Sequence, residues 1–190
     1  MAASSRGWIL FLTLAAAAAA GDLVSKSIAF ARLGMPGSGL AAVLVPRVLV
    51  LETSLNEGAL FGLGQGWGLG FAAVSVVAIV GIVALVARRV VREDTWMVVA
   101  LGLIVGGIVG NLYDRLGLPG LAWHAPPARV GEPVRAVRDW IHFQVPGVID
   151  WPIFNLADSW LVIGAGLILL LSFRPAADAP PATAPETSHG

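Results

Sequence analysis

Two long apolar stretches without a charged residue constrain the fold of this chain more than any other feature of its sequence. The first runs from Trp67 to Ala87 and the second from Thr95 to Tyr113. A helix rises 1.5 Å per residue, so about 20 apolar residues cross the hydrocarbon core of a bilayer, which is about 30 Å thick. Each stretch is therefore long enough to span a membrane as a helix.

The composition of the whole chain supports an integral membrane protein. Of the 190 residues, 57% are hydrophobic and only 13% are charged, whereas soluble domains carry about 25% charged residues. The net charge of zero leaves no basic surface to attract nucleic acid. Since the chain contains no cysteine, disulfides, thiolate metal ligands and a cysteine nucleophile are excluded.

Two further apolar stretches complete the predicted architecture, an all-α protein with four transmembrane helices. We expect a single domain over residues 1–174, with helices at about 7–30, 67–87, 95–115 and 155–173. The first helix must continue through Asp22 and Lys26 in order to span. Their four-residue spacing places them on one helix face, where they partly neutralise each other.

The first stretch also has features of a secretory signal peptide. Arg6 precedes an apolar run that ends in small residues at Ala18 and Ala20, as at a signal cleavage site. Three further spans follow, however, and Asp22-x-x-x-Lys26 has the character of a site, so we favour a retained anchor.

Four spans place both termini on the same side of the membrane. Arginine counts on the two sides are nearly equal, but Arg88, Arg89 and Arg92 lie close together in the short second loop. This density favours cytoplasmic termini. Residues 175–190 are rich in Pro and Ala without apolar periodicity, which predicts a disordered cytoplasmic tail.

The two extracytoplasmic loops differ in character. Residues 43–55 are rich in Val and Leu and precede a glycine-dense run, which predicts a small β element. That element is either a connector or a platform for an extended peptide. The longer loop, between the third and fourth helices, is bordered by most of the polar chemistry of the chain, and ionisable groups at a membrane face are candidates for function.

Several of these polar residues have a plain structural explanation. Asn155 followed by Asp158 is typical of a helix N-cap with an acidic first turn. Asp114 beside Arg115 is consistent with an interfacial charge pair. Small residues in the third helix predict close helix packing, namely Gly106, Gly107 and Gly110. The three histidines have no ligand spacing, so we expect no metal and no cofactor.

Four blocks of residues occur in the order found in bacterial lipoprotein signal peptidase, also called signal peptidase II, and the chain resembles that family from about residue 8 to residue 173. The blocks are Asp22-x-x-x-Lys26, Asn56-x-Gly58-x-x-Phe61-Gly62, Gly106-Gly107-x-x-Gly110-Asn111-x-x-Asp114-Arg115 and Phe154-Asn155-x-Ala157-Asp158-Ser159. The resemblance implies a plasma-membrane aspartic endopeptidase that cuts prolipoproteins just before a diacylglyceryl-modified cysteine.

The resemblance also implies which residues carry the reaction. One catalytic aspartate corresponds to Asp158. The other corresponds to Asp139 in Val137-Arg138-Asp139-Trp140, where Arg stands in place of a family Val. Asp150, in a similar block, is the reserve candidate. The stretch from Leu116 to Val137 is longer than in most relatives, so the local alignment between residues 116 and 150 stays open.

Supporting roles follow from the same resemblance. The residues expected to bind the peptide backbone or to order the site are Asn56, Gly58, Asn111, Arg115 and Asn155, and those expected to support it are Asp22, Lys26 and Asp114. The expected partners are diacylglyceryl-modified prolipoproteins and membrane lipids, and we expect a monomer.

The residue types fit this chemistry independently. Two neighbouring carboxylates cannot easily both ionise, so the pair offers a base and an acid together. Two other functions stay open on the sequence: a small proton-coupled transporter or channel subunit, and a scaffold that binds lipoproteins without cutting them.

Overall fold

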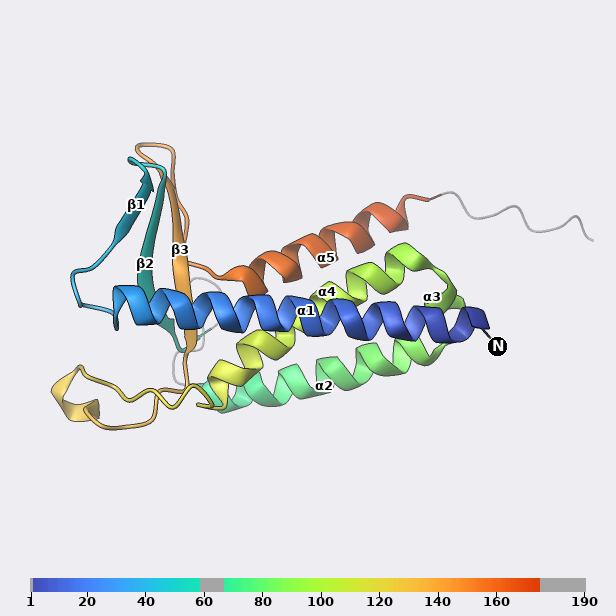
Figure 1. The fold of residues 1–190 in the computed structure, drawn as a ribbon, viewed down its shortest axis with the longest axis horizontal. Coiled ribbons are helices and arrows are strands. Elements are labelled where there is room, and N and C mark those ends of the chain that lie inside the picture. The colour runs from blue at the N-terminus through green and yellow to red at the C-terminus, as the bar shows by residue number, and fades with distance from the viewer. Residues whose placement is uncertain (1, 59–66, 175–190) are drawn as a thin grey trace, which may run out of the picture.

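Four long helices form an up-and-down bundle in the computed structural model, which describes residues 2–58 and 67–174 (Figure 1). They are α1 (Ala2–Leu33), α2 (Gly68–Ala87), α4 (Thr95–Arg115) and α5 (Leu156–Ser172), and a short helix, α3 (Arg89–Glu93), joins α2 to α4. The start of α1 and the end of α5 lie at the same end of the bundle. Phe61, Gly62 and the predicted disordered tail 175–190 lie outside the described residues.

The helix bounds match the predicted ranges closely except in α1, which extends beyond 7–30 at both ends. This helix ends at a glycine: Gly34 has a φ of 75° and its N–H donates to the carbonyl of Phe30 at 3.0 Å. Glycine adopts that left-handed conformation without strain, which makes it a common residue just past a helix end.

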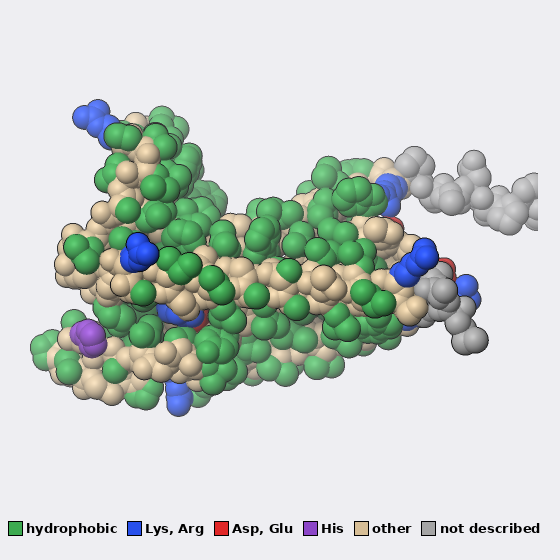
Figure 2. Space-filling view, in the orientation of Figure 1, with side chains coloured by type: hydrophobic (Ala, Val, Ile, Leu, Met, Phe, Trp, Pro, Cys, Tyr) green, Lys and Arg blue, Asp and Glu red, His purple; other side chains and the backbone are tan. Residues whose placement is uncertain are grey.

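Within residues 2–58 and 67–174, three helices are long and apolar enough to cross a membrane, namely α1, α2 and α4. The fourth, α5, is apolar but has only 17 residues, so the four-span arrangement stays a prediction. The surface of the bundle supports a lipid environment, because large aliphatic side chains point outward from it, such as Val77 and Val162. On the face shown in Figure 2, the middle of the helical body is hydrophobic and the Lys and Arg side chains lie toward its two ends.

The central helix of the bundle is α4, which packs against α1, α2 and α5. Glycines allow the close approach on both sides. A Cβ built on Gly106 would lie 2.8 Å from the carbonyl oxygen of Ala15 in α1, and one built on Gly107 would lie 3.0 Å from Cγ of Leu161 in α5. The predicted packing role of these glycines is thereby confirmed.

A four-stranded antiparallel sheet stands at the end of the bundle where α1 ends and α2 begins (Figure 1). Its order is β1 (Ala42–Val45), β2 (Leu49–Asn56), β3 (Val137–Val145) and β4 (Ile149–Asp150). The β element predicted within residues 43–55 is confirmed by β1 and β2.

The other half of the sheet was not predicted, because β3 and β4 lie in what the sequence suggested was a long loop. Arg138 and Asp139 stand next to each other in β3 and both are buried. A buried charge needs a partner, and these partners come from distant segments, so the local pattern alone does not indicate a strand.

Candidate active site

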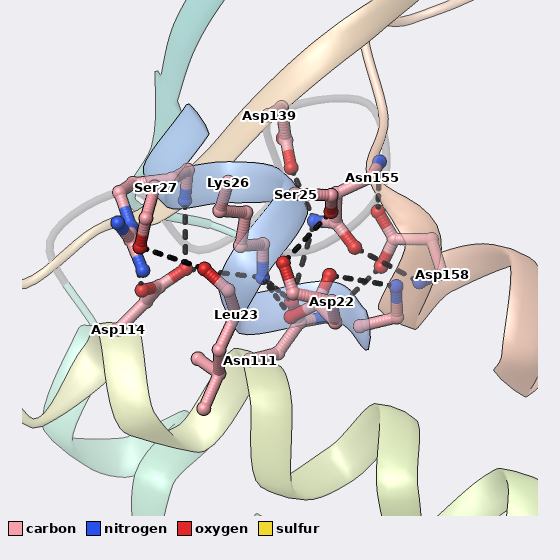
Figure 3. A network of polar contacts seen from close by, with 12 residues as sticks. Asp22, Leu23, Ser25, Lys26, Ser27, Asn111, Asp114, Asp139, Asn155 and Asp158 are labelled. Atoms are coloured by element: carbon pink, nitrogen blue, oxygen red, sulfur yellow. Dashed lines mark hydrogen bonds and ion pairs between the residues drawn. The ribbon is translucent and has the colours of Figure 1, made fainter. Parts of the chain in front are cut away.

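The buried polar side chains of the described part of the chain gather in one cluster, where α1, α4, β3 and the start of α5 meet (Figure 3). The cluster consists of Asp22, Lys26, Asn111, Asp114, Arg138, Asp139 and Asn155. Buried charges are costly unless each is paired and hydrogen-bonded. The arrangement of partners is therefore the main question about this site.

Lys26 links three of these side chains. Its Nζ lies 2.7 Å from Oδ2 of Asp22 and 3.0 Å from Oδ2 of Asp114, and it donates to Oδ1 of Asn111 at 2.9 Å. An ammonium group has three protons to donate, so three acceptors satisfy it. The predicted pairing of Asp22 with Lys26 on one face of α1 is confirmed.

Asp114 joins α4 to β3. Its Oδ1 accepts from Nε of Arg138 at 2.8 Å, and its Oδ2 accepts from the backbone N–H of Arg138 at 3.1 Å. The sequence had suggested a charge pair between Asp114 and Arg115, which is wrong. Successive residues of a helix point about 100° apart, so Asp114 faces Lys26 and Arg138 while Arg115 lines the adjoining cavity.

Arg115 instead reaches the segment that follows β2. It donates to the carbonyl of Gly58 at 3.3 Å, and its guanidinium lies 5.5 Å from the centre of the Phe71 ring.

Asn155 connects the two predicted catalytic aspartates. Its Nδ2 donates to Oδ1 of Asp139 at 2.5 Å. Its Oδ1 accepts from the backbone N–H of Asp158 at 3.0 Å, while Oδ2 of Asp158 accepts from the backbone N–H of Asn155 at 3.3 Å. Asn155 and Asp158 therefore form a capping box at the start of α5. The same asparagine that begins the helix also holds Asp139.

Asn111 completes the connection between α4 and α5. Its Nδ2 donates to Oδ1 of Asp158 at 2.9 Å, and its Oδ1 accepts from Nδ2 of Asn155 at 3.2 Å. The prediction that Asp158 belongs to a helix N-cap is thus confirmed. Its Oδ2 makes the capping bond with Asn155, and its Oδ1 accepts from Asn111.

Asp22 secures the start of α5 from the side of α1. Its Oδ1 accepts from the backbone N–H of Ala157 at 2.9 Å. This contact requires a glycine in α4, because a Cβ at Gly110 would overlap the Asp22 carboxylate.

A cavity of about 560 Å³ adjoins the cluster. Its polar lining residues include Asn56, Asn111, Arg115 and Asp158. Most of the remaining wall is apolar, for example Ile108, Phe154, Leu161 and Val162. An apolar cavity with a few converging polar groups is typical of a binding site.

Asp139 is not among the residues that line the cavity, and its side chain is only 2% exposed. Burial, together with the negative charge of Asp158, raises the pKa of Asp139 to about 7. Hydrogen bonds from Asn155 and Asn56 and the charge of Lys26 act in the opposite direction. Such a raised carboxyl pKa beside a second carboxylate is typical of acid–base sites.

Asp150, the reserve candidate, is placed away from this cluster. Its side chain is 79% exposed at the end of the sheet and its Oδ1 lies 2.7 Å from Nε2 of His142. The structure brings the other predicted residues together around the cluster and cavity, with Gly58 in the cavity wall. Among the described residues, no group of three or more His, Cys, Asp and Glu side chains could hold a metal ion.

Arg138 is the residue that the sequence analysis missed, since it stood out only as a departure from a family block. An arginine flanked by Val137 and a candidate catalytic aspartate in a membrane protein requires a buried acidic partner. That requirement could have indicated that Arg138 belongs to the site. Its partner is Asp114.

The apolar bundle, the small sheet and the buried cluster define a membrane enzyme, and solved structures with this fold agree. Two structures described as bacterial membrane enzymes, obtained by the in meso method at 2.3 and 1.9 Å resolution, superpose with TM-scores of 0.69 and 0.68. They are 25% and 26% identical to this chain, of which they cover 85% and 87%, and the matches span 86% and 94% of their own lengths.

Sequence comparison identifies the family. The profile of the family described as Signal peptidase (SPase) II matches residues 14–174. The lipoprotein signal peptidase of Rhodopirellula baltica is 43% identical over 171 residues, 87% of this chain and 72% of that protein. That of Rhodococcus jostii is 33% identical, covering 86% of this chain and 72% of that protein. The chain belongs to the signal peptidase II family, as the four sequence blocks had indicated.

Proposed function

We propose that this chain is an aspartic endopeptidase that removes the signal peptide from diacylglyceryl-modified prolipoproteins, cutting just before the lipidated cysteine. Membership of the signal peptidase II family supports the substrate class. The observation that carries the mechanism is that two hydrogen-bonded asparagines hold the two carboxylates: Asn155 donates to Asp139, and Asn111 donates to Asp158.

In the proposed reaction the two aspartates share one proton. The ionised carboxylate takes a proton from a water molecule as its oxygen attacks the scissile carbonyl carbon. The protonated carboxyl donates a hydrogen bond to the carbonyl oxygen as negative charge develops there, and the amide nitrogen is protonated as it leaves. A coupled pair titrates jointly, so the pKa of about 7 at Asp139 describes a pair that holds one proton near neutral pH.

The remaining cluster residues have supporting roles in this proposal. Asn111 and Asn155 orient the carboxylates through the bonds described above. Asn56 and Arg115, which line the cavity, are placed to bind the peptide backbone. Asp22, Lys26 and Asp114 hold α1, α4, β3 and the start of α5 in one fixed arrangement.

The membrane setting fits a lipid-bearing substrate. We propose four spans with cytoplasmic termini, which places the sheet and the site at the extracytoplasmic interface. Acyl chains gain about 0.8 kcal/mol per buried methylene and stay in the bilayer, so the scissile bond is delivered at its surface. Val162, in the cavity wall, is 72% exposed on the outer face of α5, so the cavity borders the region that lipid would occupy.

The test is cleavage of a diacylglyceryl-modified precursor by the purified protein and by Asp139→Asn, Asp158→Asn and Asp150→Asn. We expect the first two variants to lose cleavage by about a thousandfold or more, because each removes one of the two proton-transfer groups. Asp150→Asn serves as the matched control and should cleave like the unmodified protein. Thermal unfolding in detergent verifies that all three variants are folded.

Near-normal cleavage by Asp139→Asn would overturn the assignment of the pair. The same assay separates the peptidase from the scaffold and transporter alternatives, because neither of those releases a signal peptide.

A further inference from the structure

A second charged group, outside the buried cluster, surrounds Arg129. Its two terminal nitrogens each donate to one oxygen of the Glu57 carboxylate at 2.9 Å. Its Nε donates to Glu132 at 3.2 Å, and its guanidinium carbon lies 4.2 Å from the centre of the Trp123 ring. A planar guanidinium that is paired at both ends of its fork and stacked on an aromatic face has little freedom to move.

The segment that carries Arg129 is itself held together by backbone hydrogen bonds. This segment, residues 116–136, connects α4 to β3 and lies in the stretch from Leu116 to Val137 that the family resemblance predicts to be longer than in most relatives. The N–H of Trp123 donates to the carbonyl of Glu132 at 2.9 Å, and the N–H of Gly131 donates back to the carbonyl of Trp123 at 2.9 Å. Arg129 ends a short 3₁₀ helix within this hairpin-like segment, so its backbone position is fixed.

Glu57, the partner of Arg129, lies between two residues of the cavity wall, Asn56 and Gly58. Within this turn, Oδ1 of Asn56 accepts from the N–H of Gly58 at 3.0 Å. Asn56 also pairs with Val137 of β3, two residues before Asp139. The turn of residues 56–58 therefore carries a side chain that bears on both the cavity and the proposed catalytic pair.

Two arginines from different segments bind this turn. Arg115 of α4 binds the carbonyl of Gly58 with one hydrogen bond of 3.3 Å. Arg129 binds the carboxylate of Glu57 with two bonds of 2.9 Å. A bidentate pair adds geometric specificity to a charge-assisted bond, so the 116–136 segment supplies the more closely oriented of the two attachments.

We propose that Arg129 is a positioning residue for peptide cleavage, which fixes the turn of residues 56–58 in the cavity wall through its ion pair with Glu57. The inference rests on the proposed function, and neither Arg129 nor Glu57 touches the reacting atoms in it. The 116–136 segment then supports the cavity wall at residues 56–58.

The experiment compares the cleavage kinetics of Arg129→Ala, Glu57→Gln and the double variant. We expect each single variant to raise KM about fivefold and to leave kcat within about twofold, because a loosened turn weakens substrate binding rather than proton transfer. Since both variants break the same pair, the double variant should have the same KM as either single one.

Two further variants separate positioning from a general structural defect. Glu132→Ala removes the exposed partner of Arg129 and keeps the fork on Glu57, so its KM should be unchanged. The charge-exchanged pair Glu57→Arg with Arg129→Glu should recover at least half of the lost affinity. Arg129→Lys should recover less, because a lysine cannot bind both carboxylate oxygens in a fork.

Amide hydrogen exchange at Gly58 tests the same contact without cleavage. We expect faster exchange in Arg129→Ala and no change in Glu132→Ala. The inference would be overturned by an unchanged KM in Arg129→Ala or by unchanged exchange at Gly58. It would also be overturned if the increases in KM of the two single variants multiplied in the double variant. If the unmodified protein fails to cleave, the proposed function falls, while the exchange measurement still decides whether Arg129 holds the turn.

Discussion

Strand β3 carries a group of charged residues toward each of its ends, and the two groups differ in burial. At the first end, Arg138 and Asp139 are buried and bind partners from α4 and the start of α5. Toward the second end, His142 binds Glu52 of β2 and Asp150 of β4, whose side chains are 38% and 79% exposed. The first group is bonded to residues of the helical bundle, while the second is bonded to residues of the neighbouring strands.

This difference shows that the residues packed around a carboxylate, and not its local sequence, determine its burial and its pKa. Asp139 and Asp150 both precede a tryptophan in similar blocks. Only Asp139 is buried beside another carboxylate, which keeps its pKa near 7. The predictions below test this contrast, beginning with the largest expected effect.

Removing the cation of the buried group should have the largest effect. In Lys26→Met, the carboxylates of Asp22 and Asp114 would face each other without their shared partner. Removing one member of a buried ionic group typically costs about 3–5 kcal/mol, so we expect a large drop in the thermal unfolding temperature.

The matched control is Arg89→Ala, which removes an exposed i,i+4 pair with Glu93. Water and salt screen an exposed pair of this kind, so its unfolding temperature should stay close to that of the unmodified protein. Equal effects of the two variants would contradict the contrast between buried and exposed charges.

A methyl group on Gly110 should have the next largest effect. The added Cβ would overlap the carboxylate of Asp22, which binds the start of α5. Overpacking of this kind costs about 1–3 kcal/mol, and we expect cleavage to fall by at least tenfold as Asp158 is displaced. In Gly166→Ala of α5, a Cβ meets nothing within 4 Å, so that variant should keep full cleavage.

The pH dependence of cleavage tests the proton held by the buried pair. Cleavage should decline as the pH rises through about 7, because the proton on Asp139 is lost there. Asn56 lowers the pKa of Asp139 through its hydrogen bond, so Asn56→Ala should raise that pKa and shift the alkaline decline to higher pH. A shift to lower pH would show that Asn56 does not act on this carboxyl.

The exposed group should give the smallest effect. Partial burial lowers the pKa of His142, but its hydrogen bonds to Asp150 and Glu52 outweigh this and raise the pKa above its ordinary value. A raised pKa in the folded state stabilises the protein below the unfolded pKa of about 6.5, and this contribution disappears as the pH rises through the folded pKa.

Glu52→Gln should therefore lower the unfolding temperature slightly at pH 6 and hardly at all at pH 9. The expected loss is at most about 1 kcal/mol, since water and salt screen such a pair. Cleavage should be unaffected. An equal loss of stability at both pH values would mean that Glu52 acts through packing and not through the charge of His142.

The helices could be predicted from the sequence because their signal is local. Runs without charge fix α2 and α4, and the four-residue spacing of Asp22 and Lys26 fixes their contact. The rest of the site depends on contacts between distant segments. Arg138 finds Asp114 across 24 positions, and Asn111 finds Asp158 across 47, and no local pattern contains such a pairing. The resemblance assigned Asp139 with Asp150 in reserve, but the burial that separates the two depends on the same distant contacts.

The alternation of charge along β3 also bears on how the sheet assembles. Arg138 and Asp139 point to opposite faces of the strand, as successive residues of a strand do. Arg138 donates to the Asp114 carboxylate, and Asp139 accepts from the Asn155 amide. A slip of one residue against β2 would exchange the two faces. A slip that moved Asp139 into the place of Arg138 would bring its carboxylate toward Asp114, which binds Arg138 in the structure. Repulsion between the two carboxylates would disfavour that register, so the residues that build the site also help to select the pairing of the strands.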